Sequence, residues 1–401
     1  MPLLSVDEAL ARILAGADPL SAEPTPLLEA TQRVLAEDVR ATLTQPPFDA
    51  SAMDGYAARA ADLAILPARL QLIGESRAGQ AFAGLVGPGE CARIFTGAPV
   101  PAGVDAVVIQ ENATLNGNTI TVAEGTVDFD HIRPRGGDFT ENQVLLSSGR
   151  VLDARAILLA AAMGHGTLAV RRKPVVAILA TGDELVEPGI QPGPDQIVSS
   201  NPYGLAAMIA AAGAQPRLLG IAADTRAALE AKIAAAADAD ILLTTGGASV
   251  GDHDLVGPVL RSRGMDLDFW KIAMRPGKPM LFGRLGAQRV LGLPGNPVAA
   301  MVCARVFLLP LIDRLLGRQV SDVAPLRAQL TTATGKNGPR QHYMRAVTSR
   351  DASGKLHVTL QPSQDSSLVR LLAASNALVV RMPNDPALPA GAEVDVLPLD
   401  F

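Results

Sequence analysis

The sequence is poor in cysteine, in basic charge and in long apolar runs. Its two cysteines, Cys91 and Cys303, lie far apart and show no CxxC or zinc-ligand spacing, so we expect buried thiols in a reducing compartment. The formal net charge of −5 offers no basic field for a nucleic-acid backbone. No apolar run approaches the roughly 20 residues of a membrane span, and MPLLSVDEAL lacks the basic region of a signal peptide. We therefore expect a soluble, cytoplasmic protein that binds neither nucleic acid nor membrane.

Aromatic residues are also scarce, at 3% of the chain, whereas glycine and proline number 37 and 30. The cores of such a chain must be built from Ala, Val and Leu, with many turns between short elements. A hydrophobic content of 48% excludes wholesale disorder. At 401 residues the chain exceeds one ordinary hydrophobic core, so we expect two to four domains.

The first part of the sequence indicates two domains, one of them interrupted by the other. Ser5 and Glu8 form a capping box before an amphipathic helix, and a second helix is expected from about Leu27 to Val34. Short alternating runs such as RLQLIG and DAVVIQEN then predict β structure, before DARAILLAAAMGHG returns to helical periodicity. We predict a discontinuous helical/mixed domain of residues 1–42 and 143–172, and a β-rich insert domain of residues 43–142.

From Lys173 onward, apolar strands alternate with glycine-containing loops and helices. This alternation predicts a mostly parallel sheet with helices on both faces. One helix, NPYGLAAMIAAAG, has Asn201 as its expected N-cap and Gly213 as its C-cap. The last stretch returns to short strands, typical of a small barrel or sandwich. The predicted fold class is therefore α/β multidomain, with a doubly wound α/β domain at residues 173–318 and a C-terminal β-barrel-like domain at residues 319–401.

Ligands of open α/β sheets bind beyond the carboxyl ends of the strands, so the residues that follow each strand are candidates for a site. The residues that follow the four relevant strands are Thr181, Gly182, Asp183 and Glu184; Asp224; Gly246, Gly247, Ser249, Gly251, Asp252 and Asp254; and Pro294 to Pro297. Backbone N–H groups at the glycine pair can form an anion-binding nest. Carboxylates can hold Mg²⁺, which bridges to phosphate oxygens. Arg275 and Lys278 of RPGKP can supply charge for a phosphate or another oxyanion.

Each of these features also has a plain structural interpretation. A glycine pair after a strand is commonly a turn, and Asp224 is a residue type that caps helices. Asp183 and Glu184 suit a solvated loop, and His253 has no second histidine at ligand spacing. Asn296 of LPGNP can simply cap the following helix. Their joint placement at strand ends nevertheless favours a nucleotide- or phosphate-binding α/β enzyme that uses Mg²⁺.

Six motifs occur in an order that resembles one known family. They are FDASAMDGYA, RIFTGAPVP, ILATGDEL, TTGGASVGDHD, RPGKPM and GLPGNPVAAM, and together they extend over nearly the whole chain. The chain closely resembles the molybdopterin molybdenumtransferase family, whose members are bacterial MoeA-type proteins and the E domain of gephyrin. The resemblance implies the last step of molybdenum cofactor synthesis. Adenylylated molybdopterin and molybdate react in the presence of Mg²⁺, molybdenum is placed on the dithiolene, and AMP is released.

The resemblance also implies roles for individual residues. Asp54, Thr96 and Glu184 are expected to orient the reacting end of the substrate, and Asp224 and Asp254 to hold Mg²⁺ and the nucleotide. The residues expected to bind substrate, nucleotide or molybdate are Thr181, Gly182, Asp183, Gly246, Gly247, Ser249, Gly251, Lys271, Arg275, Lys278, Pro294 and Pro297. Arg275 stands where some relatives have Lys, so a bidentate donor replaces a point charge. Gly137 stands where relatives often have an acidic residue.

Partners follow from the same resemblance. Family members are elongated homodimers with the active site between subunits, and a molybdopterin adenylyltransferase is the expected upstream donor. Two alternatives stay open at this point. One is a non-catalytic scaffold of the gephyrin E-domain type, against which the absence of an appended partner domain argues. The other is a molybdopterin adenylyltransferase, which would consume ATP and whose chain is usually shorter.

Overall fold

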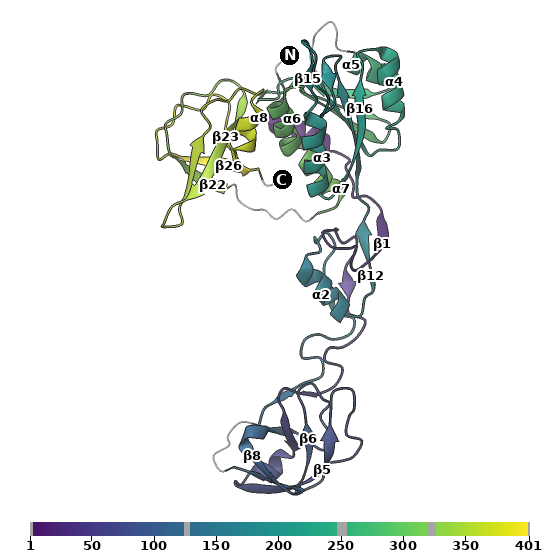
Figure 1. Ribbon diagram of the computed structural model, residues 1–401, viewed down its shortest axis with the longest axis vertical. Helices are drawn as coiled ribbons and strands as arrows, with labels where there is room; N and C mark the ends of the chain where they lie inside the picture. The colour runs from purple at the N-terminus through teal and green to yellow at the C-terminus, as the bar shows by residue number, and fades with distance from the viewer. Residues whose placement is uncertain (1–2, 124–128, 247–254, 319–325, 400–401) are drawn as a thin grey trace. The chain divides into compact units, whose positions relative to one another are not determined.

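The computed structural model describes residues 3–123, 129–246, 255–318 and 326–399 of the chain (Figure 1). Residues 247–254 of the predicted glycine-rich loop lie outside these ranges, among them the candidates Gly247, Ser249, Gly251, Asp252 and Asp254 and the neighbouring His253. The chain forms two compact units. The first unit comprises Met1–Glu23, Gln32–Ala36 and Val170–Phe401, and the second comprises Pro24–Thr31 and Glu37–Ala169. This division is coarser than the four predicted domains, whose boundaries stay a prediction.

A six-stranded sheet forms the core of the second unit. Its strand order is β7 (Ala106–Ile109), β4 (Gly55–Ala58), β6 (Glu90–Ile94), β5 (Ala68–Ser76), β9 (Thr119–Val122) and β8 (Ala113–Asn116). Leu70, Cys91 and Ile120 are fully or almost fully buried against one another in this sheet. The β structure predicted for this stretch is therefore confirmed.

Short elements complete the second unit. They are β2 (Val39–Arg40) paired with β11 (Val144–Leu146), β3 (Ala50–Ser51) paired with β10 (Ile132–Arg133), the helix α2 (Ala154–Ala162) and the single turns η1 (Ala60–Leu63) and η2 (Gln110–Asn112). Asp153 caps α2, because its carboxylate accepts a hydrogen bond from the amide of Ala156 at 2.8 Å. Strands β1 (Ala22–Pro26) and β12 (Thr167–Arg171) form a two-stranded sheet.

The helix expected between Leu27 and Val34 is not formed. The chain makes a single turn there, in which the amide of Ala30 donates to the carbonyl of Pro26 at 3.0 Å. Gln32 then adopts a positive φ of 64°, a conformation that no helix continues through. Leu35 instead pairs with Val170 in an isolated β-bridge. Tertiary pairing has overridden a weak helical pattern of seven or eight residues, a length at which isolated helices are marginal.

The α/β part of the first unit is a six-stranded sheet with helices on both faces, as predicted (Figure 1). The strand order is β16 (Gln215–Ala222), β13 (Val175–Thr181), β17 (Ile241–Thr245), β21 (Gln288–Leu293), β20 (Leu281–Leu285) and β18 (Asp266–Trp270). The first four strands run parallel, and β20 and β18 are antiparallel to their neighbours. The helices of this part are α1 (Val6–Leu14), α3 (Asn201–Ala211), α4 (Arg226–Ala234), α5 (Val256–Ser262), α6 (Pro297–Cys303), the π-helical turn η3 (Ala304–Leu308) and α7 (Leu309–Leu315). A short parallel pair, β14 (Leu185–Val186) and β15 (Ile197–Val198), lies outside the sheet.

Alternation along the central strands divides the apolar side chains between two layers. Leu179 of β13 and Leu242 of β17 are fully buried against Leu229 of α4 and Val259 of α5. Val176, Ile178 and Ala180 of β13 are equally buried, and α3 packs against this strand. Central parallel strands are covered on both sides, so a continuous apolar run such as VVAIL is what this position requires.

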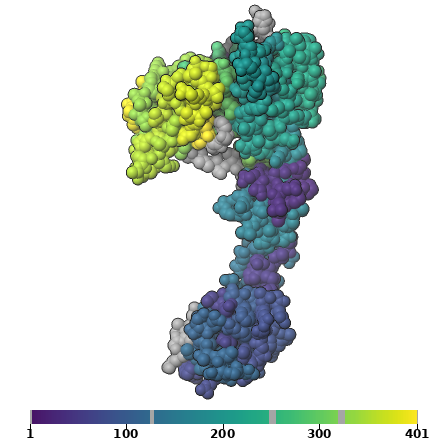
Figure 2. Space-filling model, viewed as in Figure 1, coloured from purple at the N-terminus to yellow at the C-terminus, as the bar shows by residue number. Residues whose placement is uncertain are grey.

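The C-terminal region of the first unit is a closed five-stranded barrel, which confirms the predicted barrel-like fold. The strand order is β23 (Gln341–Arg350), β24 (Leu356–Leu360), β22 (Leu326–Leu330), β26 (Glu393–Pro398) and β25 (Ala377–Arg381), and β25 pairs back onto β23. The helix α8 (Val369–Ala373) precedes β25, and β19 (Met274–Arg275) extends the sheet beside β23. Ala and Val fill the interior, as the scarcity of aromatic residues requires. The barrel forms the yellow-green surface in Figure 2 and the α/β part the teal one.

Three expectations from the sequence can be compared with the structure. Both cysteines are free and buried, and burial raises the pKa of each thiol to about 12. Ser5 caps α1, since its hydroxyl oxygen accepts from the amide of Glu8 at 3.2 Å. Within the described ranges, none of the helices has the length and apolar character needed to cross a bilayer.

Leu242→Ala should lower the free energy of unfolding of the first unit by about 2–5 kcal/mol, because it removes buried methyl groups from a fully packed core. Chemical denaturation can be followed through Trp270, the only tryptophan, which lies in β18 of the same sheet. Leu218→Ala is the matched control: this leucine of β16 is 45% exposed, and its loss should change stability by less than about 0.5 kcal/mol. Equal losses in the two variants would contradict the assignment of Leu242 to the core.

Candidate active site

The site lies where the parallel strands of the α/β sheet end. Thr245 at the end of β17 pairs with Ala180 of β13 and with Leu293 of β21, so three carboxyl ends lie level with one another. Polar loops that follow these strands are therefore brought to one edge, as predicted from the sequence.

Backbone packing at this edge is unusually close at Gly246. This residue has a positive φ of 89°, and its amide donates to the carbonyl of Leu293 at 3.3 Å. A Cβ at this position would lie 2.6 Å from the carbonyl oxygen of Thr181, and a Cβ on Gly295 would lie 3.7 Å from the Cα of Gly246. Only glycine satisfies both the conformation and the contact, so the glycine after β17 is more than a simple turn.

A cavity of about 500 Å³ opens beside these loops. Its wall includes residues of all three strand ends, of β14 and β15, of the start of α3 and of one barrel loop. The lining residues are Thr181, Glu184, Leu185, Ile197, Val198, Ser199, Ser200, Asn201, Thr245, Gly246, Pro279, Pro294, Gly295, Asn296, Pro297 and Ser367. Thr181, Glu184, Gly246, Pro294 and Pro297 were predicted from the sequence, and the structure brings these five together.

The side-chain amides of two asparagines form hydrogen bonds between segments of the cavity wall. Asn201 donates from Nδ2 to the carbonyl of Gly295 at 2.7 Å, and Asn296 donates to the hydroxyl oxygen of Ser366 at 2.9 Å. The expected capping role of Asn201 is wrong, because α3 already begins at this residue and Ser200 holds the N-cap position. Asn296 does hold the N-cap position of α6, yet it makes no side-chain capping bond. Both amides connect loops instead.

Asp183 and Asp224 lie next to each other at the neighbouring strand ends. The Asp183 carboxylate accepts from the backbone amide of Asp224 at 3.0 Å. Asp224 is not the cap of α4, since Thr225 holds that position and accepts from the amide of Ala228 at 3.3 Å. Neither aspartate is among the residues that line the cavity, and the same is true of Gly182.

The predicted cationic residues share one loop, which runs from β18 to β20 of the sheet and pairs through β19 with strand β23 of the barrel. The amide of Lys271 donates to Met280 at 2.8 Å, which closes the loop, and Lys271 has a positive φ of 76°. Its ammonium lies 5.5 Å from the centre of the Trp270 ring, a cation–π contact. Arg275 and Lys278 are exposed, and Arg275 stands in β19 opposite His342 of the barrel. Only Pro279 of this loop lines the cavity, so the structure does not place the three cationic side chains in its wall.

Asp54 and Thr96, in the second unit, form a tight pair of their own. The Asp54 carboxylate accepts from both the amide and the hydroxyl of Thr96, at 2.8 and 2.7 Å. These two bonds, the backbone one first, hold the pKa of Asp54 below its ordinary value, with a smaller contribution from Arg93. Arg93 in turn stacks over Tyr56 and Phe95, with its guanidinium carbon 4.9 and 5.0 Å from the ring centres. Asp54 therefore stays ionised and fixed in direction.

Acidic residues at the strand ends are the candidates for a metal site. Among the residues that the structure describes, no three His, Cys, Asp or Glu side chains group as a metal site. Asp254, predicted to hold Mg²⁺, lies outside those residues. Mg²⁺ is usually bound by one or two carboxylates with water and substrate phosphates. The Asp183 carboxylate lies against the backbone amide of Asp224, so these two acidic residues are adjacent at neighbouring strand ends.

Three family models match this chain in succession. The MoeA N-terminal region (domain I and II) matches residues 4–164, the probable molybdopterin binding domain residues 177–314, and the MoeA C-terminal region (domain IV) residues 327–399. The molybdopterin molybdenumtransferase of Haemophilus influenzae is 35% identical, over 99% of both chains. The chain belongs to the MoeA family. The enzyme of the same name from Bacillus subtilis is 34% identical, over 98% of this chain and 94% of its own.

Solved structures agree with this membership of the MoeA family. The crystal structure of the molybdopterin biosynthesis MoeA protein from Pyrococcus horikoshii is 28% identical, with a TM-score of 0.86 over 98% of each chain. The family predicted from six motifs is thus confirmed, and with it the multidomain fold and the expectation of an enzyme of molybdenum cofactor biosynthesis.

Some cavity residues of this MoeA family member were not predicted. Ser199, Ser200 and Ser367 carry no motif, nor does Ser366, which accepts from Asn296 beside the cavity, and Ile197 and Val198 belong to a two-residue strand too short to recognise. The polar run PSQDSS in a domain of apolar strands was the available indication for Ser366 and Ser367. Its position is fixed by Arg345, which is almost fully buried and donates to the carbonyls of Ser363, Asp365 and Leu368.

Gly246→Ala should disrupt the strand-end cavity, since its Cβ would meet the Thr181 carbonyl. Gly264→Ala is a matched control in the same unit, with a φ of 90° and nothing within 4 Å of the added atom. The free energy of unfolding of the control should fall by about 1–2 kcal/mol, the cost of an alanine in the left-handed conformation. That of Gly246→Ala should fall distinctly further. Thermal or chemical unfolding measures both. Equal losses of stability in the two variants would show that the close backbone contact at Gly246 does not contribute to the cost of the substitution.

Thr96→Val should raise the pKa of Asp54 toward its ordinary value, because the hydroxyl bond is lost while the backbone bond remains. Since the carboxyl is more acidic in the folded protein, its contribution to stability is present above the ordinary pKa and is lost as pH falls through the lowered one. Carboxyl ¹³C NMR titration measures the shift. Asp153, held at low pKa chiefly by the Ala156 amide, is the internal control and should not move.

Proposed function

We propose that this chain is a molybdopterin molybdenumtransferase. It inserts the molybdenum of molybdate into the dithiolene of adenylylated molybdopterin and releases AMP, with Mg²⁺ present. The observation that carries this proposal is the cavity at the carboxyl ends of β13, β17 and β21, in a chain whose full-length relatives bear that enzyme name. Both substrates are anions, and the site supplies the chemistry to position them.

The cavity suits a phosphate-linked substrate because its wall offers backbone and hydroxyl donors. Ser199 and Ser200, which precede α3, and Asn201, its first residue, line the cavity, so the N-terminus of an 11-residue helix faces it. A helix N-terminus favours an anion through its unpaired N–H groups and its dipole. Thr181 and Thr245 add hydroxyls at the strand ends. Among the described residues of the wall, Glu184 is the one carboxylate, and a cation beside the substrate would offset its charge.

Magnesium is the cation that this arrangement favours. Asp183 and Asp224 would hold it, with Asp254 as the predicted further ligand, and Mg²⁺ would neutralise phosphate charge as AMP departs. Lys271, Arg275 and Lys278 are proposed to attract molybdate to the adjoining loop. The protein's own task is then mainly positioning and charge compensation, which can account for large rate enhancements.

We further propose a cytoplasmic homodimer whose active site lies at the subunit interface. Asp54 and Thr96 would contribute to that site, and a molybdopterin adenylyltransferase would supply the substrate. The loop that carries Asp54 supports the dimer, because Phe48 and Met53 beside it are 39% and 42% exposed and available to a second subunit. Two free thiols are consistent with a reducing compartment.

Incubation with adenylylated molybdopterin, molybdate and Mg²⁺ should release AMP, and Asp224→Asn should slow this release by at least about 10-fold. That factor is the lower end of the loss typical when a partner of a metal site is removed. Asp238→Asn is the control, since Asp238 pairs with Arg217 at 2.6 Å away from the strand ends and should retain full turnover. Running the assay with tungstate as well tests the choice of oxyanion.

Three outcomes would contradict the proposal in different ways. Bound substrate without AMP release would exclude the transferase reaction. Consumption of ATP with molybdopterin would identify an adenylyltransferase instead. Full turnover in Asp224→Asn, with loss of a partner protein, would favour the scaffold function.

A further inference from the structure

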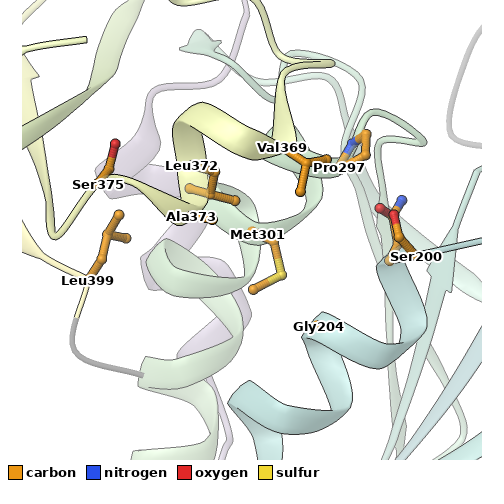
Figure 3. A pocket seen from close by; sticks show the side chains of 10 residues that line it. Ser200, Gly204, Pro297, Met301, Val369, Leu372, Ala373, Ser375 and Leu399 are labelled. Carbon is orange, nitrogen blue, oxygen red and sulfur yellow. The ribbon is translucent and has the colours of Figure 1, made fainter.

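A second hollow adjoins the strand-end cavity and differs from it in character. It measures about 300 Å³ and lies between the first turns of α3 and α6 and the short helix α8 (Figure 3). Ser200, Asn201 and Pro297 line both hollows, so the two are immediate neighbours. We call this second hollow the apolar annex. Its walls are formed chiefly by Gly204, Met301, Val369 and Leu372.

The annex is open because α3 has no side chain at its floor. A Cβ on Gly204 would lie 3.3 Å from Sδ of Met301 and 3.7 Å from its Cε, so glycine leaves that space to the groove. Glycine costs about 0.5–1 kcal/mol relative to alanine inside a helix, a cost that needs a compensating role. Its polar lining residues are Ser200, Asn201 and Ser375, and Ser200 and Ser375 lie at opposite ends of it (Figure 3). An apolar slot with a few polar groups at its rim is the usual form of a small-molecule site.

The annex lies at one end of an ordered series along the sheet edge. Asp224 follows β16, Thr181 ends β13, Gly246 follows β17, and Pro294–Pro297 follow β21 beside the annex. Three strand-to-strand steps separate the Asp224 end from the annex end, about 14 Å. A substrate that places a phosphate group in the central cavity can therefore reach Asp224 with one end and the annex with the other.

We propose that the annex binds the fused heterocyclic ring system of the pterin-carrying substrate, with its pyrophosphate in the cavity and its AMP end toward Asp224. This inference rests on the proposed function. A flat heteroaromatic ring suits walls of Met301, Val369 and Leu372, because thioether and aliphatic groups pack favourably on aromatic faces. The amide edge of such a ring can hydrogen-bond to the hydroxyls of Ser200 and Ser375. The annex thereby sets specificity for a pterin without touching the nucleotide.

Gly204→Leu fills the annex and tests this assignment. The variant should bind adenylylated molybdopterin at least about tenfold more weakly, while its Kd for AMP stays at the wild-type value. Equilibrium ultrafiltration measures both, with the retained pterin oxidised to its fluorescent form for detection. Ala207→Leu is the matched control, since Ala207 is exposed on the same helix and does not line the annex. It should bind both ligands as the wild type does.

Val369→Gln tests the opposite wall in case the first variant folds poorly. Val369 is 44% exposed, so the fold tolerates glutamine, and the polar wall should weaken binding of the pterin substrate severalfold but not of AMP. Unchanged affinity for the pterin substrate in both variants would overturn the proposal, as would an equal loss of AMP binding, which would place adenine in the annex. If the wild-type protein binds adenylylated molybdopterin without releasing AMP, the result would contradict the proposed reaction and leave the assignment of the annex intact.

Discussion

The close approach of two backbones at Gly246 is the constraint on which the site depends. The parallel pairing of β13, β17 and β21 brings their carboxyl ends level, and Gly246 then passes against the Thr181 carbonyl at a distance no side chain allows. Loops from three strands can therefore share one cavity instead of diverging. The central strands are buried on both faces, so this arrangement is held by the core of the α/β part and not by the loops themselves.

The barrel contributes to the same cavity through a different kind of interaction. Arg345 of β23 is almost fully buried, and its guanidinium donates to three carbonyls of the segment before α8. Burial disfavours the charged form of this guanidinium, so the pKa of Arg345 lies below its ordinary value. The three hydrogen bonds hold the loop in place. In this loop Ser366 accepts from Asn296, and Ser367 lines the cavity. Polar contacts of this kind determine position more than stability.

Charge is separated in space within the first unit. Aspartates lie at the β16 and β13 ends, and the cationic residues Lys271, Arg275 and Lys278 occupy the β18–β20 loop, which pairs with the barrel through β19. In the proposed reaction this separation lets a cation and an oxyanion approach the substrate from different directions. The apolar annex adds a third environment beside the two charged ones. One edge thus offers carboxylates, helix amides and an apolar slot in sequence, which matches a long substrate with chemically distinct parts.

The sequence by itself determined the elements whose pattern is local or repeated. Apolar runs between glycines predicted the central strands, and their order along the chain predicted which residues reach the common edge, because parallel strands must end on the same side. Six motifs identified the family. Only the tertiary structure decided that Leu27–Val34 is no helix, that Asn201 joins loops instead of capping, and that Ser367 from the barrel lines the cavity. These outcomes depend on partners distant in the chain, and local propensity is too weak to specify such contacts.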